Sequence, residues 1–262
     1  MAKFYPMFSG SKGNATYIGT AEGGVIVDVG VSAKRMCAAL CSADITLDKV
    51  DAILITHEHS DHVRGLKTFL KKTGATLIAS RKTLSVLKDM GLIEENTNII
   101  YADEAEEISV KDMKIKRFAT SHDCEGSSGY TISFGKTKTA VCTDTGILTD
   151  EIRENLEGSK LVLLESNHDP VMLRLGPYPP ELKVRIGSEK GHLANADCAA
   201  EIKRLYSLGT THFVLAHLSE NNNTTEKASS ATRAALMDLG ANINQDYILY
   251  VAPPEDGKVI SL

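Results

Sequence analysis

Short apolar runs alternate along the chain with segments whose apolar residues recur at helical spacing. Residues 52–55 and 161–164 are typical of buried strands, whereas 63–70 and 196–208 show the helical period. In the middle of the chain the apolar positions alternate over shorter stretches, as they do in antiparallel sheets. No linker, repeat or low-complexity stretch interrupts this pattern. We therefore expect residues 1–262 to form a single α/β domain.

Several helix boundaries are also visible in the sequence. Ser32 predicts the N-cap of a helix that runs through Leu40, and Asn195 predicts the cap of the helix at 196–208. Gly91 is expected to close a helix at 82–90. A strand at 247–252 is expected to be the last element of the chain.

Residues that can bind metals or protons repeatedly follow the predicted strands. Open α/β folds place their sites beyond strand ends, so side chains that are distant in sequence can converge there. Each such histidine or aspartate on its own could equally be an ordinary buried residue, a turn residue or a helix cap. The residues in these positions are Asp28, His57, His122, Asp144, His168 and His217.

The densest group of candidate ligands lies directly after the strand that ends near residue 55. His57, His59, Asp61 and His62 fall within one strand-to-helix turn. His57 and His59 are two residues apart, so on an extended backbone both can point the same way. Imidazole and carboxylate donors suit zinc, manganese or iron. The turn therefore predicts a metal site, and Asp61 with His62 could serve a second ion.

Two further features suggest supporting roles. The small residues of the loop at 9–14, which includes Ser11 and Asn14, could cradle an oxyanion with backbone N–H groups, although a plain hairpin turn has the same composition. Asp28 could orient a metal-binding histidine through a hydrogen bond.

Composition narrows the class of protein. The net charge is −5, which argues against a broadly basic surface that coats nucleic acid but allows a short DNA end or a small phosphate ester. The five cysteines include no CxxC pair, and no apolar run approaches the length of a membrane span or signal peptide. We expect a cytoplasmic protein with no membrane contact, and the sequence leaves its oligomeric state open. Cys37 and Cys41 are expected to be buried apolar groups, and Cys124 to pack rather than bind metal.

Taken together, these residues resemble the metallo-β-lactamase fold superfamily over essentially the whole chain. Asp28, the motif at 57–62, His122, Asp144 and His217 occur in that superfamily's order. The resemblance implies an αββα sandwich, two mixed sheets with helices on the outer faces, and two divalent ions, zinc or manganese with iron as a further option. It assigns the first ion to His57, His59 and His122, and the second to Asp61, His62 and His217, with Asp144 bridging and Asp28 orienting a ligand.

The branch of the superfamily is indicated by other residues. Asp144 and His62 resemble the phosphodiesterase and glyoxalase II branches rather than true β-lactamases. The segments 9–14, 166–170 and 191–193, with the run at 217–223, are similar to the YycJ/WalJ group of bacterial cytoplasmic metallohydrolases, which are described as DNA 5′-exonucleases.

This resemblance implies a hydrolase that attacks phosphodiester bonds with a metal-bridging hydroxide. His192 is the candidate proton donor, with His168 and Glu165 as second choices and Asp61 as a further catalytic group. Ser11, Asn14 and Asn222 are candidate substrate contacts. The expected partner is a DNA end or a small phosphodiester. The alternatives are a cyclic phosphodiesterase, a glyoxalase II-like thioesterase, and a metal-bound scaffold without activity.

Overall fold

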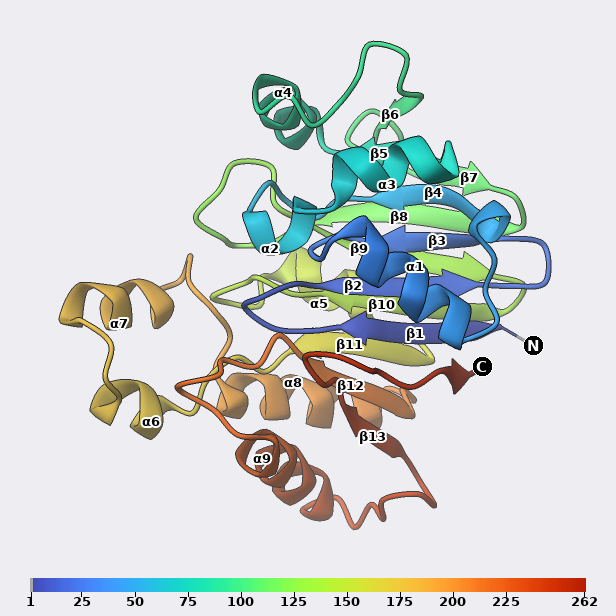
Figure 1. Cartoon of the computed structure of the whole chain (residues 1–262). Helices are drawn as coiled ribbons and strands as arrows, with labels where there is room; N and C mark the ends of the chain where they lie inside the picture. The colour runs from blue at the N-terminus through green and yellow to red at the C-terminus, as the bar shows by residue number, and fades with distance from the viewer. Residues whose placement is uncertain (1) are drawn as a thin grey trace. The chain divides into compact units, whose positions relative to one another are not determined.

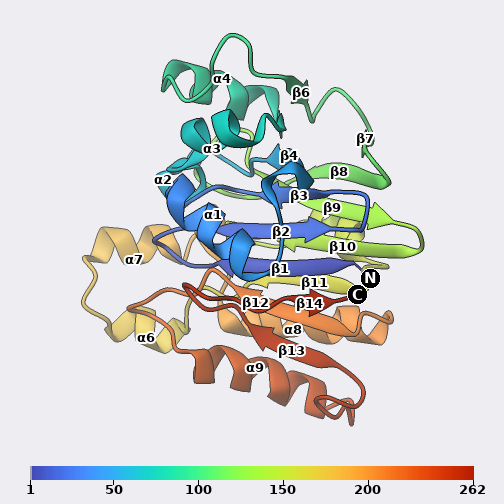
Figure 2. The same cartoon turned by 45° about the vertical axis from the view of Figure 1, so that its right-hand side comes forward.

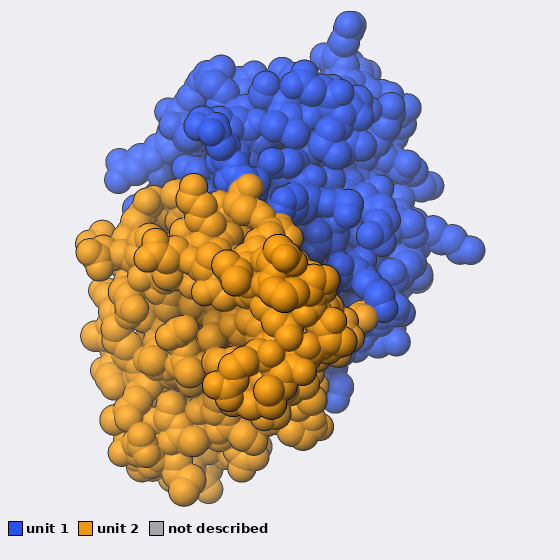
Figure 3. Space-filling model, turned by 90° about the vertical axis from the view of Figure 1, so that its left-hand side faces the viewer, with its two compact units in different colours: residues 1–117, 124–137, 253–262 blue, residues 118–123, 138–252 orange. Residues whose placement is uncertain are grey.

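The computed structural model describes residues 2–262, which divide into two compact units (Figure 3). Unit 1 comprises residues 1–117, 124–137 and 253–262, and unit 2 comprises residues 118–123 and 138–252. No helix in the described residues is both long enough and apolar enough to cross a membrane.

Unit 1 is built around a mixed sheet with the strand order β14-β1-β2-β3-β4-β5-β6 (Figure 1). Strands β14, β1, β2 and β3 pair antiparallel, and β3 to β6 pair parallel. The bounds are β1 Lys3–Phe8, β2 Ala15–Gly19, β3 Gly24–Val27, β4 Val50–Leu54, β5 Thr76–Ala79, β6 Ile99–Tyr101 and β14 Ile260–Ser261. The parallel half therefore directs the ends of β3 and β4 to one edge of the sheet, where Asp28 and the 57–62 motif follow.

The helices of unit 1 lie over this sheet (Figure 1). They are α1 Ala33–Ser42, α2 Ser60–Val63, α3 Leu66–Thr73 and α4 Arg81–Asp89, with a 3-10 turn η1 at Leu47–Lys49. Met36 and Leu40 of α1 and Leu66 and Phe69 of α3 are almost completely buried in one core with the sheet. Burial of each such side chain contributes roughly 1.5–3 kcal/mol, so the apolar stripe fixes both helices.

The helix predicted at 63–70 is in fact two helices, α2 and α3, which meet at Gly65. A Cβ at Gly65 would lie 2.0 Å from the carbonyl oxygen of Val31, so the backbones approach too closely for any other residue. The amide of Gly65 also donates to the Val29 carbonyl, at 2.9 Å. This contact with a distant segment bends the chain, and the local apolar spacing does not reveal it.

The remaining strands of unit 1 belong to a second sheet. β7 Ile108–Val110 pairs antiparallel with β8 Met113–Ala119, and β9 is Ser128–Phe134. Tyr130 of β9 is completely buried, and its hydroxyl donates to the carbonyl of Ile55 at 2.7 Å. This bond fixes β9 against the point where the chain leaves β4.

The strands of unit 2 form the parallel part of the second sheet, in the order β13-β12-β11-β10. The bounds are β10 Thr137–Cys142, β11 Leu161–Glu165, β12 His212–Ala216 and β13 Ile248–Val251. The helices are α5 Asp150–Leu156, α6 Pro170–Leu175, α7 Pro180–Ile186, α8 Asn195–Ser207 and α9 Thr225–Met237. Figure 2 shows α8 and α9 side by side. Because the strands run parallel, Asp144, Glu165 and His217 meet at one sheet edge.

Mixed sheets with helices confirm the predicted α/β class, but several details of the prediction are wrong. Ala194, not Asn195, is the N-cap residue of α8, and it makes no side-chain cap bond. The last strand is β14, a short element that pairs with β1 and carries too little apolar pattern to be visible in the sequence. Cys37 is half-buried at the margin of the unit 1 core, and Cys41 is exposed. The N-cap at Ser32 is confirmed, since its side chain accepts from the amide of Arg35.

Candidate metal centre

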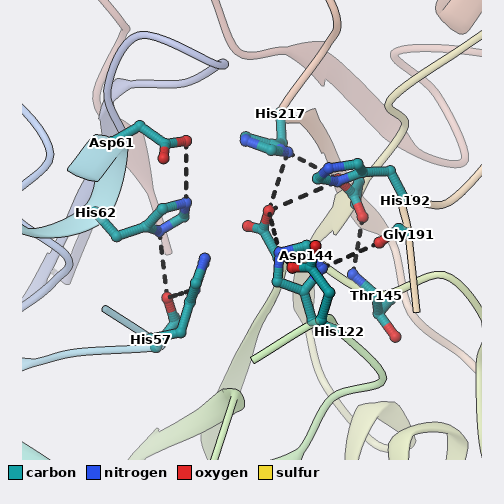
Figure 4. Close-up of polar contacts among 12 residues, drawn as sticks. His57, Asp61, His62, His122, Asp144, Thr145, Gly191, His192 and His217 are labelled. Carbon is teal, nitrogen blue, oxygen red and sulfur yellow. Dashed lines mark hydrogen bonds and ion pairs between the residues drawn. The ribbon is translucent and has the colours of Figure 1, made fainter. Parts of the chain in front are cut away.

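The motif of unit 1 follows β4 and runs into α2, with His59 at the N-cap position. His57 and His62 are completely buried, whereas His59 and Asp61 are half-buried. The ring centroid of His57 lies 4.6 Å from that of His59 and 4.1 Å from that of His62. In the left half of Figure 4, His57, His62 and Asp61 lie together at the end of this turn. The turn thus gathers three imidazoles and a carboxylate, as the sequence predicts.

Asp28 orients one of these rings from the end of β3. Its Oδ2 atom is 2.8 Å from Nδ1 of His62, and its Oδ1 accepts the backbone amide of Thr56 at 2.8 Å. The Thr56 hydroxyl contacts the Asp28 carboxylate and lies 3.0 Å from Nδ1 of His57. Burial raises the pKa of Asp28, and the neighbouring His62 opposes that rise. Because oxygen atoms engage Nδ1 of both rings, Nε2 is the nitrogen that can bind a metal.

Asn14 is buried inside the loop at 9–14 rather than exposed on its surface. Its amide bonds to both the amide and the carbonyl of Gly10, which closes the loop on itself. Its Nδ2 also lies 3.3 Å from Oδ2 of Asp61 and 3.2 Å from Nε2 of His62. Ser11, by contrast, is exposed. Asn14 is therefore placed to position Asp61 and His62, and Ser11 and Lys12 are the exposed residues of this loop.

The residues of unit 2 gather around the buried carboxylate of Glu165, at the end of β11. Oε1 of Glu165 accepts from Nδ1 of His192 at 2.8 Å and from Nδ1 of His217 at 2.7 Å. Oε2 accepts the backbone amides of Thr145 and Leu193, at 3.0 and 3.2 Å. Both oxygens are engaged, so Glu165 orients the two imidazoles. Figure 4 shows His192 and His217 next to each other in this group.

Asp144 and His122 lie beside this group. Oδ1 of Asp144 is 3.6 Å from Nδ1 of His217 and 3.7 Å from Nε2 of His122. Nδ1 of His122 is 3.1 Å from the carbonyl oxygen of Gly191, which sets the ring so that Nε2 faces Asp144 (Figure 4). Burial lowers the pKa of His122, although the Asp144 charge opposes this. A neutral imidazole is the form that binds metal ions.

Backbone strain marks the same positions in each unit. Asp28 and, separately, Asp144 and His217 adopt left-handed conformations, with φ values of 64°, 56° and 55°. Each follows directly on, or one residue after, the end of a parallel strand. Left-handed conformations in residues other than glycine cost roughly 1–3 kcal/mol and concentrate at functional sites. The strained turns aim these side chains past the strand ends.

The two candidate proton donors differ in their surroundings. Burial lowers the pKa of His192, but the Glu165 and Asp144 carboxylates raise it more, so that it lies above the ordinary value of 6.5. His168 is almost completely buried, and burial lowers its pKa. Among the described atoms, Nδ1 of His168 has no hydrogen-bond partner. These surroundings favour a protonated His192 and a neutral His168.

A cluster of buried amides supports His217 and was not predicted as part of the site. Asn167 Nδ2 donates to the backbone carbonyl of His217 at 2.8 Å. Asn223 in turn donates to the carbonyls of Ser166 and Asn167, at 2.8 and 3.0 Å, and to the side chain of Asn195 at 2.9 Å. The only signal in the sequence was the number of asparagines after the strands, which also suits ordinary turns.

Asn222, a predicted substrate contact, is completely buried. Its Nδ2 lies 3.4 Å from the Ser219 hydroxyl, and its backbone carbonyl accepts the amide of Asp169 at 2.8 Å. The side chain therefore helps to hold the loop after β12, and its burial does not favour direct contact with a substrate.

The donor sets of both units suit divalent ions. Within unit 1, one donor atom each from His57, His59 and Cys124 lies within 4.8 Å of the others, and within unit 2 the same holds for Asp144, Glu165, His192 and His217. The buried histidines whose Nδ1 atoms are oriented by oxygen atoms are typical of metal ligands held by a supporting layer. The residues present therefore fit the metal ions that the sequence analysis expects.

Comparison with known proteins identifies the family. The profile of the Beta-lactamase superfamily domain matches residues 25–218. The chain is 33% identical over 253 residues to exodeoxyribonuclease YycJ of Bacillus anthracis, covering 96% of each protein. It is also 33% identical over 258 residues to exodeoxyribonuclease WalJ of Streptococcus pneumoniae serotype 2, covering 97% of this chain and 95% of that protein.

A solved structure shows the same fold. The metallo-β-lactamase fold protein YhfI from Bacillus subtilis matches over 100% of both chains with a TM-score of 0.73 at 14% identity. The mixed sheets, the family profile and this match agree with the fold expected from the sequence. The chain therefore belongs to the metallo-β-lactamase superfamily, and its relatives at 33% identity are YycJ and WalJ.

Proposed function

We propose that this protein removes nucleotides from the 5′ ends of DNA by two-metal hydrolysis of phosphodiester bonds, in the cytoplasm. Family membership makes it a metal-dependent hydrolase. The observation that carries the finer proposal is 33% identity, over nearly the full length, to proteins named exodeoxyribonucleases. We also propose that residues 1–262 form the single domain predicted from the sequence, because the family profile matches residues of both units.

The proposal gives each candidate ligand a role. His57, His59 and His122 would bind one divalent ion and Asp61, His62 and His217 the other, with Asp144 shared. Asp28, through its 2.8 Å contact with Nδ1 of His62, would keep Nε2 of that ring directed at its ion. Zinc and manganese both suit this mixture of imidazole and carboxylate donors.

Bound divalent ions supply an activated water and stabilise negative charge on the phosphoryl oxygens. The chain itself must then protonate the leaving sugar oxygen. His192 is suited to this task because Glu165 holds its Nδ1 and raises its pKa, which keeps a proton available near neutral pH. Asp61 would act by holding its ion, and Ser11, which is exposed in its loop, would contact the DNA backbone.

The test is digestion of duplex DNA labelled at the 5′ end, with Mn²⁺ or Zn²⁺ added to metal-free protein. We expect release of labelled nucleotides by the wild type, and loss of at least about a hundredfold in rate with Asp144→Ala, together with loss of bound metal. Asp150→Ala, in the first turn of α5, is the matched control and should keep full activity. Wild-type turnover by the Asp144 variant would contradict the assigned role.

A small phosphodiester is the second candidate substrate, and the net charge of −5 favours it over long DNA. The same protein should therefore be assayed on cyclic nucleotides and on a lactoylglutathione-type thioester. Hydrolysis of either of these without any release from duplex DNA would replace the exonuclease proposal.

A further inference from the structure

Unit 1 places a thiol beside two of the candidate metal ligands. The sulfur of Cys124 and one ring nitrogen each of His57 and His59 lie within 4.8 Å of one another. His57 is completely buried, while His59 and Cys124 are half-buried. Two imidazoles and a thiol form a donor set that binds zinc strongly. The sequence alone predicts only packing for Cys124, and its proximity to His57 and His59 becomes visible only in the structure.

The segment that carries Cys124 is held in place by its neighbours. Two hydroxyls donate to the carbonyl of Gly126, that of Thr83 at 3.3 Å and that of Ser128 at 2.9 Å. The guanidinium of Arg117 donates to the carbonyl of Ser127 at 3.3 Å. Gly126 has a φ of 91°, and a Cβ there would lie 2.5 Å from the hydroxyl of Ser80. The turn is thus packed against the start of α4.

The histidine segment is tied to the same structure. Tyr130, six residues beyond Cys124 in the chain, donates from its buried hydroxyl to the Ile55 carbonyl at 2.7 Å. Ile55 precedes His57 by two residues. One hydrogen bond therefore links the thiol-bearing segment to the histidine-bearing segment, and the approach of the three donors is a product of the fold.

We propose that Cys124 is a thiolate ligand of the metal ion held by His57 and His59, and that it makes this position prefer zinc to manganese. As the metal–sulfur bond forms, the thiol proton leaves to solvent. Bond lengths of about 2.0 Å to nitrogen and 2.3 Å to sulfur bring donors to roughly 3.5 Å apart, so the side chains move together on binding. The inference rests on the proposed function only in that His57 and His59 bind a metal.

The other thiols of the chain do not compete for this role. Cys142 and Cys198 are completely buried, and burial raises the pKa of both. Cys37 and Cys41 lie on α1, and no candidate metal group among the described residues contains them. Cys37 is half-buried like Cys124, which makes Cys37→Ser the matched control for loss of a thiol.

The experiment is addition of one equivalent of Co²⁺ to the metal-free full chain, followed by absorption spectroscopy. Wild type and Cys37→Ser should show a near-ultraviolet band of sulfur-to-cobalt charge transfer. Cys124→Ser and Cys124→Ala should lose that band yet still bind cobalt through the histidines. Thermal unfolding of the metal-free proteins shows whether each variant is folded as the wild type is.

Competition titrations with a chelator give the second readout. Cys124→Ser should weaken zinc binding by at least the roughly 10–100-fold that loss of an outer metal-site partner costs, and should change manganese binding much less. Equal losses for both metals would overturn the inference.

The outcomes separate this inference from the proposed function. Wild-type protein that binds cobalt without the sulfur band refutes only the role of Cys124. Wild-type protein that binds no cobalt refutes the metal site and the thiolate together. Presence of the band without any cleavage of DNA supports Cys124 and contradicts the exonuclease proposal.

Discussion

At the scale of single residues, Glu165 contacts several parts of the candidate site at once, and the sequence suggested it only as a second-choice proton donor. One of its oxygens accepts from both His192 and His217, and the other accepts two backbone amides. The two histidines lower the pKa of this buried carboxyl well below its usual range, even though burial itself raises it. Glu165 therefore stays ionised and fixes the orientation of both rings.

Replacing Glu165 with glutamine should lower the pH at which activity is lost on the basic side. In the proposed mechanism His192 acts as an acid, so activity should fall as pH rises through its raised pKa, and removal of the Glu165 charge lowers that pKa. We expect the basic limb of kcat against pH to move down, with roughly a 10–100-fold loss in rate. Glu189→Gln is the control. A basic limb that stays in place would exclude His192 as the titrating acid.

At the scale of elements, the segment between α7 and α8 places His192 and the carbonyl that orients His122. Gly191 carries that carbonyl, and a Cβ on it would lie 2.2 Å from the carbonyl oxygens of Arg185 and Ile186. Gly187 lies in the same segment, where the nearest atom to an added Cβ is 3.4 Å away. The two glycines thus differ in whether the backbone leaves room for a side chain.

Gly191→Ala should destabilise the protein by about 1–3 kcal/mol, because the added carbon forces packed backbone apart. The shift should also turn the ring of His122 and reduce bound metal. Gly187→Ala should leave both properties near those of the wild type. The measurements are denaturant unfolding of the metal-free proteins and metal content after dialysis. If Gly191→Ala matches the wild type in both, the backbone around Gly191 accommodates the added carbon and the prediction is wrong.

Elements whose signal is local could be predicted from the sequence, and those set by distant contacts could not. The apolar runs of β4, β11 and β12 correctly placed His57, Glu165 and His217 just past, or at, strand ends. The break at Gly65, the role of Asn195 as a buried hydrogen-bond partner and the pairing of β14 depend on residues 29 or more positions away. Composition and periodicity do not reveal contacts between residues that are distant in the sequence.

At the scale of the whole molecule, metal binding should contribute to stability as well as to chemistry. The candidate ligands are drawn from segments that extend from His57 to His217, so the unfolded chain has no preformed site. An ion that binds only the folded state stabilises it according to its concentration relative to its Kd. Metal binding therefore stabilises the folded arrangement of the segments that supply the ligands.

Removal of metal with a chelator should lower the melting temperature by roughly 10 °C. About 4 kcal/mol is expected when free metal is a thousandfold above Kd, and each kcal/mol shifts a chain of this length by about 2–4 °C. Differential scanning calorimetry with and without chelator measures the shift, and added zinc should restore it. Identical melting temperatures would contradict tight binding to the folded state.

The left-handed backbone at Asp28, Asp144 and His217 has a consequence for engineering. Glycine adopts this conformation at no steric cost, so replacement at these positions would relax the chain by roughly 1–2 kcal/mol while deleting a donor atom. A screen that selects heat resistance of the metal-free protein alone would be drawn to such replacements. Mutant libraries of this protein should therefore leave the strand-end turns unchanged and place stabilising substitutions at other positions.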